Sequence, residues 1–66
     1  MKVYIKYNND VIEIEENVSS KFRYVAKTIE LFDDYTCKYT HVYDDHISTK
    51  VYHSCSKYDK YLKYFQ

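Results

Sequence analysis

The sequence predicts an α+β domain of two layers, ordered ββα-ββα, with a four-stranded, mostly antiparallel sheet and two helices on one face. Three observations predict it. Residues 1–15 and 35–55 alternate apolar and polar side chains, which is typical of half-buried strands. Residues 19–32 and 57–65 carry apolar side chains at helical spacing. A chain of 66 residues is also the size of one small domain, so residues 1–66 form a single domain.

The first strand pair is expected to close at a tight turn. Apolar residues fall on odd positions up to Tyr7 and on even positions from Ile12 onward. A two-residue turn at Asn9-Asp10 accounts for this change of parity and places Tyr7 opposite Ile12. Asparagine and aspartate suit such a turn because they tolerate positive φ better than most residues.

A helix is expected over residues 19–32. Asn17 or Ser19 can cap its start, and Asp33-Asp34 ends it. Its core-facing stripe consists of Val18, Phe22, Val25, Ala26, Ile29 and Phe32.

The second strand pair spans residues 35–55. A three-residue loop, Asp44-Asp45-His46, keeps the parity and pairs Cys37 with His53. Residues 46–52 are also compatible with a short helix instead of a strand.

The last helix is expected at about residues 57–65. Ser56 and Asp59 form a capping box at its start, with Asp in place of the usual Glu or Gln. Its apolar stripe comprises Tyr58, Tyr61, Leu62 and Phe65.

The composition excludes several classes of function. The chain has no glycine and no proline, so it lacks the glycine-rich loops that hold phosphates in Walker and Rossmann sites. Ten basic and ten acidic residues balance, which favours neither nucleic acid nor a basic partner. No signal peptide or membrane-spanning run is recognisable, which predicts a cytoplasmic protein or one made inside a host cell.

The cysteines and histidines are the residues most suited to chemistry. Cys37, His41, His53 and Cys55 resemble a zinc set, but Cys37 and His41 lie about 13 Å apart along a strand and cannot share one ion. A Cys37–Cys55 disulfide is not expected, because the two residues are diagonal neighbours about 7–8 Å apart in this register. A Cys37–His53 catalytic pair lacks a third partner. We therefore expect no metal, no cofactor and no enzymatic activity.

Partner contacts are expected on two helix faces and one strand. Tyr24, Thr28 and Leu31 form a second, exposed stripe on the first helix. Lysines beside an exposed ring on the last helix suit a nucleic-acid backbone or an acidic protein. With Tyr52 on the polar face of the second hairpin, the predicted contact residues are Tyr24, Thr28, Leu31, Tyr52, Lys57, Lys60, Lys63 and Tyr64.

The opening of the chain resembles a known family. The stretch VYIKYNNDVIEIEENV, followed by Val25 and Ile29, is similar to the start of elongin C and BTB-type adaptors. The resemblance implies strand, turn, strand and helix, and an adaptor function. It covers only the first half of the chain, since that family continues with helices where a second hairpin is expected here.

Ten tyrosines point to a binding protein, because tyrosine supplies a large, rigid contact area at low entropic cost. The leading hypothesis is a protein-protein interaction module of the kind that phages and viruses use as stoichiometric inhibitors of host defence proteins. The alternative is a small nucleic-acid-binding protein. Unprotected sheet edges further predict a homodimer, or a protein that grips its target by strand addition.

Overall fold

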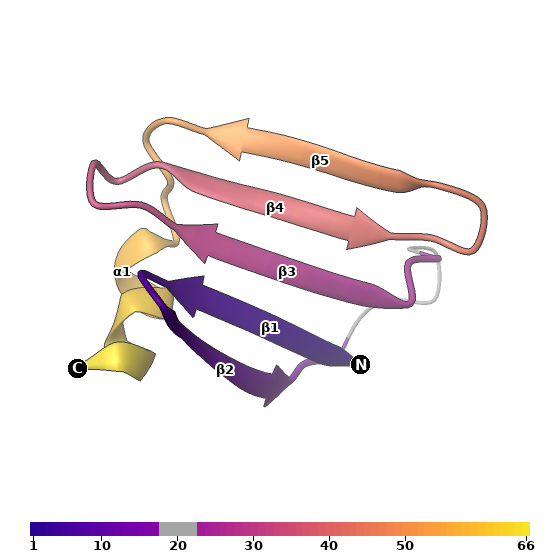
Figure 1. The fold of residues 1–66 in the computed structure, drawn as a ribbon, viewed down its shortest axis with the longest axis horizontal. Helices are drawn as coiled ribbons and strands as arrows, with labels where there is room; N and C mark the ends of the chain where they lie inside the picture. The colour runs from indigo at the N-terminus through magenta and orange to yellow at the C-terminus, as the bar shows by residue number, and fades with distance from the viewer. Residues whose placement is uncertain (18–22) are drawn as a thin grey trace.

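The computed structural model describes residues 1–17 and 23–66. These residues form one mixed sheet in the order β2-β1-β3-β4-β5, with a short helical segment at the C-terminal end (Figure 1). The elements are β1 (Lys2–Tyr7), β2 (Asp10–Glu15), β3 (Ala26–Leu31), β4 (Cys37–Val42), β5 (Ile47–Tyr52), helix α1 (Tyr58–Leu62) and the 3-10 turn η1 (Lys63–Phe65).

The predicted architecture of four strands and two helices is therefore wrong. The sheet has five strands, one neighbouring pair of which, β1 and β3, is parallel. In the described part of the chain, the helical residues are those of α1 and η1. In this part of the chain, no helix is long and apolar enough to cross a membrane.

The first hairpin forms with the predicted faces but with a shifted register. Its turn is Asn8-Asn9, and Asn8 adopts a positive φ of 54°. Ile12 pairs with Ile5 and not with Tyr7. A shift of two positions keeps each side chain on its face, because side chains alternate with a period of two. The alternation thus fixed the faces, while the asparagine with positive φ fixed the turn.

Strand β3 replaces the second half of the predicted first helix. Along β3, Lys27, Ile29 and Leu31 are buried and alternate with half-buried residues. Ile29 and Leu31 were predicted on two different stripes of a helix, but pairing with β1 on one side and β4 on the other makes a strand in which both are buried. Val25 and Phe32, predicted for the core, are exposed. The predicted helix start, Val18 to Phe22, lies outside the described residues.

The second hairpin is confirmed as two strands, but its register differs by one position. Cys37 pairs with Tyr52 and not with His53. The loop of this hairpin has two residues, Asp44-Asp45, and not the predicted three, because the Tyr43 amide donates to the His46 carbonyl at 2.8 Å. The rings of Tyr43 and His46 stack with centroids 4.4 Å apart. A slip of one position exchanges the two faces of a strand, so the apolar side chains of β5 turn away from the helix side of the sheet.

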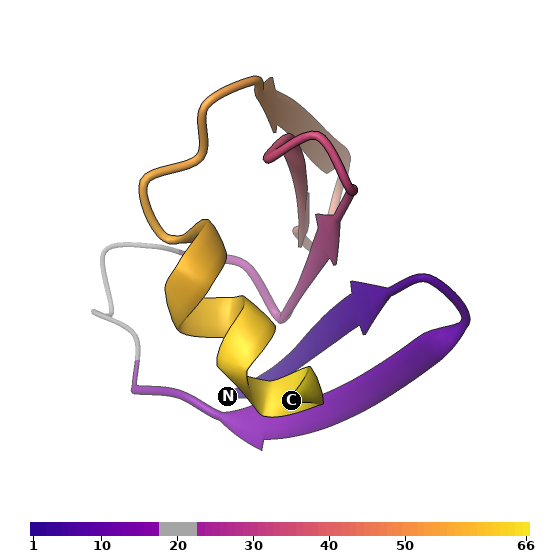
Figure 2. The same cartoon turned by 90° about the vertical axis from the view of Figure 1, so that its left-hand side faces the viewer.

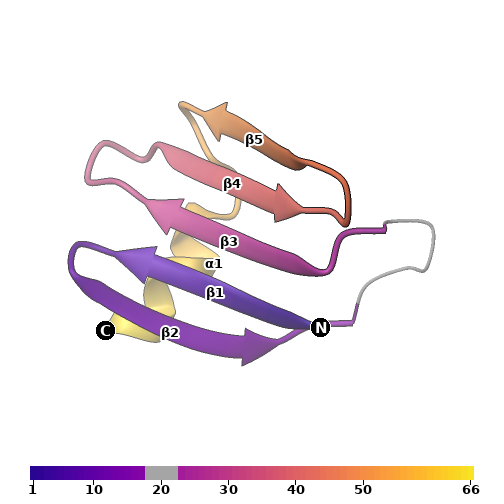
Figure 3. The same cartoon turned by 45° about the vertical axis from the view of Figure 1, so that its right-hand side comes forward.

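Helix α1 lies against one face of the sheet, near the ends of β1 and β3 (Figures 1 and 3). Figure 2 shows the loop of residues 53–57 descending from β5 to this helix. The predicted apolar stripe is confirmed, since Tyr58 and Tyr61 are buried and Leu62 and Phe65 pack against them. The predicted capping box is wrong: the N-cap is Lys57, and no side chain caps the helix. The core consists of Val3, Ile5, Ile29, Leu31, Cys37, Tyr58 and Tyr61.

A disulfide joins Cys37 of β4 to Cys55 of the loop before α1, with a Cα–Cα distance of 5.9 Å. This bond contradicts the prediction of two free thiols. The predicted register placed the two residues too far apart, whereas in the observed register β5 ends at Tyr52 opposite Cys37 and the following loop folds back. The Cys55 amide also donates to the Tyr35 carbonyl at 3.2 Å, which fixes the loop against the sheet.

Candidate functional site: the free edge of β5 and its neighbouring pocket

Strand β5 is exposed at all six of its residues. It lies at one edge of the sheet and pairs with β4 alone. Its large apolar side chains are therefore in water: Ile47 is 66% exposed, Val51 47% and Tyr52 41%. Such side chains add nothing to the core of the domain, and their concentration on one edge strand marks it as a candidate contact surface.

The hydrogen-bonding direction along β5 follows from its turn. Tyr43 and His46 form a bonded pair, and bonded and non-bonded pairs alternate along an antiparallel ladder. Ser48, Lys50 and Tyr52 therefore bond to β4. Ile47, Thr49 and Val51 direct their N–H and C=O groups outward from the sheet. The outward backbone groups and the exposed aliphatic side chains thus belong to the same residues.

The other edge of the sheet, β2, has a different character. The Met1 ammonium group and the Glu16 carbonyl are 3.2 Å apart, and the Glu16 amide donates to the Met1 carbonyl at 2.9 Å. By the same alternation, Val11, Glu13 and Glu15 direct their backbone groups outward. Two of these three residues are charged, and natural proteins use such charges to protect edges against pairing.

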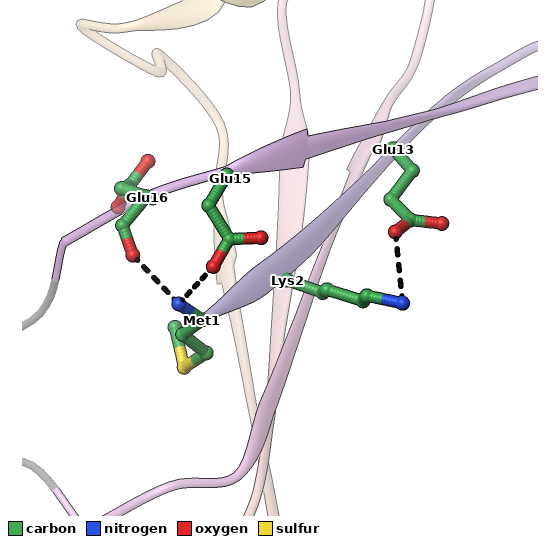
Figure 4. A network of polar contacts seen from close by, with 5 residues as sticks. All are labelled: Met1, Lys2, Glu13, Glu15 and Glu16. Carbon is green, nitrogen blue, oxygen red and sulfur yellow. Dashed lines mark hydrogen bonds and ion pairs between the residues drawn. The ribbon is translucent and has the colours of Figure 1, made fainter.

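Both glutamates of the β2 edge are held in ion pairs (Figure 4). Glu15 lies 2.6 Å from the Met1 ammonium group, and Glu13 lies 3.3 Å from the Lys2 ammonium group. These contacts hold the pKa of Glu15 below its usual value, mainly through the hydrogen bond with the N-terminal amine. The outward-facing residues of the β2 edge thus include two ion-paired carboxylates, whereas those of the β5 edge are the uncharged Ile47, Thr49 and Val51.

A pocket of about 320 Å³ lies beside the end of β5 on the helix side of the sheet. Tyr39 and Tyr52 form one wall, with their ring centroids 5.4 Å apart in an edge-to-face arrangement. The loop before α1 forms the other wall through Ser54, Cys55, Ser56 and Lys57. Two predicted contact residues, Tyr52 and Lys57, thus come together here, although they were expected on separate surfaces.

Further along the same face, His41 lies among aromatic rings and a lysine. Its ring centroid is 4.6 Å from that of Tyr24 and 6.4 Å from that of Tyr39. Lys27 is buried, forms an ion pair with Glu16 at 3.4 Å and lies 5.6 Å from the centroid of Tyr39. Burial, and secondly the positive charge of Lys27, lower the pKa of His41 below its usual value. This part of the face is a packed cluster whose lysine already has a carboxylate partner.

The predicted stripe of Tyr24, Thr28 and Leu31 does not form one surface. Leu31 is only 2% exposed and belongs to the core. Thr28 is half-buried within β3, and Tyr24 contacts His41 and Tyr43. The stripe was predicted from helical spacing, and the spacing does not apply to a strand.

The basic residues of the last helix are placed as predicted. Lys57, Lys60, Lys63 and Tyr64 are all exposed. Within the described residues, no carboxylate lies within ion-pair distance of the three lysines. Lys60 lies 5.4 Å from the centroid of the Tyr61 ring. Whether these residues contact a partner stays a prediction.

The cysteines and histidines do not gather into a reactive site. Both cysteines are consumed by the disulfide. Among residues 1–17 and 23–66, no three His, Cys, Asp or Glu side chains gather as metal ligands would.

Sequence reasoning did not select Ile47, Thr49 and Val51 as contact residues, because the register with Cys37 opposite His53 puts them on the same face as Cys37. The signal that could have located them is the Tyr43–His46 pair around Asp44-Asp45, because a two-residue turn at that point reverses the facing of β5.

Comparison with known proteins adds no assignment: no protein-family model, no curated protein and no solved structure matches the chain. The helix that the elongin C and BTB resemblance implies after the first hairpin is replaced at residues 26–31 by strand β3.

Proposed function

We propose that the protein is a stoichiometric binding module that grips a partner protein by adding a partner strand to the free edge of β5. The observation that carries this proposal is the difference between the two sheet edges. Outward backbone groups lie beside uncharged side chains on β5, whereas β2 presents two glutamates. In strand addition, backbone hydrogen bonds supply affinity and alternate side chains supply specificity.

The side chains around the β5 edge define the partner segment. On the outer face, Ile47 and Val51 offer aliphatic contacts to every second residue of an added strand. On the opposite face, Lys50 lies 5.4 Å from the centroid of the Tyr52 ring and has no carboxylate partner among the described residues. The complementary segment is therefore extended, with apolar residues on one face and an acidic residue facing Lys50.

Thr49→Pro tests the proposal. Proline removes the outward N–H at the centre of the edge, and the ladder to β4 does not use this N–H. We expect the variant to keep its fold and lose the proteins that the wild type captures from a lysate. The loss should be at least about tenfold, since several hydrogen bonds of about 0.5–1.5 kcal/mol each depend on the edge.

Two controls make the outcome specific. Thr49→Val keeps the N–H and should bind as the wild type does. Glu13→Pro places the same change at the centre of the β2 edge and should leave capture unchanged. Equal capture by Thr49→Pro and Thr49→Val would show that the edge is not used.

The predicted homodimer would use the same edge, with Thr49 at the two-fold axis of an antiparallel pair of β5 strands. Light scattering distinguishes the two partners. A mass of twice 8.1 kDa that returns to 8.1 kDa in Thr49→Pro identifies a second copy. A mass of 8.1 kDa for both proteins contradicts the homodimer and leaves the edge to a different protein.

Nucleic-acid binding is the second candidate, supported by the exposed Lys57, Lys60 and Lys63, which have no ion-pair partner among the described residues. Affinity for a single-stranded oligonucleotide should then fall steeply with salt, by about 0.7 log units per log unit of salt for each phosphate contact. Strand addition to β5 would show little dependence on salt. Two further points remain predictions: that the partner is a host defence protein, and that the chain is a phage or viral inhibitor.

A further inference from the structure

The pocket beside Tyr52 has a lining suited to a small ligand. It is lined by Tyr39, Tyr52, Ser54, Cys55, Ser56 and Lys57, and no carboxylate side chain of the described residues lines it. Its volume of about 320 Å³ is at the lower end of the range for small-molecule sites, about 300–1,000 Å³. An aromatic wall with a few hydrogen-bond donors and one charge is the usual composition of such sites.

We propose that this pocket binds a small ligand that joins a planar ring to an anionic group, such as an aryl phosphate or a nucleotide. Tyr39 and Tyr52 meet edge to face, at an interplanar angle of 80°. Aromatic groups favour offset-stacked or edge-to-face contacts of this kind, so a third ring fits beside them. Lys57, Ser54 and Ser56 also line the pocket, and their side chains carry the kinds of donor that an anionic group requires.

The charge balance around the pocket supports an anion over a cation. Among the described residues, Lys57 forms no ion pair. The Lys50 ammonium group lies 5.4 Å from the centroid of the Tyr52 ring and adds a second positive charge near this wall. A cationic ligand would meet repulsion from both lysines.

Two of the residues that line the pocket are held in place before a ligand binds. Cys55 is tied to β4 by the disulfide, and the Tyr39 hydroxyl lies 3.9 Å from the Cys55 sulfur. Burial raises the pKa of Tyr39 above its usual value, so its phenol stays neutral. A preformed site loses less conformational entropy on binding than one that must be ordered. The ligand site is distinct from the strand-addition edge, because Ile47, Thr49 and Val51 do not line the pocket.

The test is a titration of the ¹⁵N-labelled protein with phenyl phosphate, benzoate and adenosine monophosphate, followed by amide chemical shifts. Inorganic phosphate and adenosine serve as probes that carry only one of the two groups. We expect shifts at Ser54, Cys55, Ser56 and Lys57 with phenyl phosphate or adenosine monophosphate, and at least about tenfold weaker binding of the single-group probes. Equal binding of inorganic phosphate, equal binding of adenosine, or no shifts at these residues would overturn the proposal.

Variants separate the pocket from general charge attraction. Lys57→Gln should weaken binding of phenyl phosphate at least about tenfold by removing a charge-assisted contact. Lys63→Gln removes an exposed charge outside the pocket and should change it less than about twofold. Tyr52→Leu keeps an apolar side chain but removes a ring, and should weaken binding about tenfold. Similar effects of Lys57→Gln and Lys63→Gln would mean that the ligand is attracted by overall charge and not by this site.

Discussion

At the scale of single residues, the Cys37–Cys55 disulfide is the feature with the largest consequence for stability. It joins residues 18 positions apart and ties the loop before α1 to the first residue of β4. A cross-link closing a loop of this length restricts the unfolded chain and stabilises the fold by about 3 kcal/mol. Disulfides persist in oxidising compartments and are reduced in the cytoplasm, so this stabilisation depends on the compartment in which the protein resides.

Removing the disulfide should therefore destabilise the protein without changing its fold class. For the double variant Cys37→Ala/Cys55→Ala, we expect the free energy of unfolding to fall by about 2–4 kcal/mol, as measured by urea denaturation. The wild type in the presence of a thiol reductant should show a similar loss. Unchanged stability in both experiments would mean that the bond does not form in solution.

His41 makes stability depend on pH. Burial, and secondly the charge of Lys27, depress its pKa below 6.5, so the folded protein binds this proton less readily than the unfolded chain does. The contribution is fully present above pH 6.5 and is lost as the pH falls below it. The hydrogen-bonded carboxylates Glu15, Asp34 and Asp45 have usual pKa values of 4.5 or less, so they affect stability at lower pH.

Chemical denaturation at a series of pH values measures this effect. Between pH 6.5 and about pH 5, the wild type should lose stability more steeply than His41→Gln. His53→Gln is the matched control, because it also removes one histidine, but an exposed one that forms no ion pair among the described residues. This control should keep the wild-type slope. Identical slopes for wild type and His41→Gln would contradict the assignment.

At the scale of elements, the sequence predicted the features that local patterns determine. It missed the features that depend on pairing between distant strands. Alternation located the first hairpin and both of its faces, and helical spacing located α1 with Tyr58 and Tyr61 in the core. The sequence-based prediction failed at β3, because Ile29 was assigned to the core stripe of a helix and Leu31 to its opposite side, whereas pairing with β1 and β4 makes a strand that buries both.

The candidate site was predicted only in part, because register depends on turn geometry. Tyr52 and Lys57 were identified as contact residues, but their meeting in one pocket depends on how the loop folds back after β5. The outward facing of Ile47 and Val51 follows from a shift of one position at the Tyr43–His46 turn. Alternation alone cannot fix such a shift, since both registers keep the same period.

Two substitutions distinguish a core strand from an edge strand. Leu31 of β3 is buried, so Leu31→Ala should lower the free energy of unfolding by about 2–5 kcal/mol. Ile47 of β5 is 66% exposed, and Ile47→Ala should change it by less than about 0.5 kcal/mol. Thermal and urea denaturation measure both. Comparable losses would mean that β5 is part of the core and not a free contact strand.

At the scale of the whole molecule, the two faces and two edges of one sheet have separate roles. The helix side holds the core and the pocket, the β2 edge presents two ion-paired glutamates, and the outward-facing residues of the β5 edge are uncharged. A domain of 66 residues has a small core. Its proposed contact surfaces use side chains that lie outside this core, so they take little away from the stability of the fold.

Amide hydrogen exchange, measured residue by residue in the free protein and in its complex, tests the role of the β5 edge. In the free protein, the amides of Ile47, Thr49 and Val51 should exchange fast, and those of Ser48 and Lys50 slowly, because only the latter bond to β4. In the complex, the first three should become protected, while Glu13 at the β2 edge stays unchanged. Fast exchange at Ile47, Thr49 and Val51 in a saturated complex would contradict strand addition at β5.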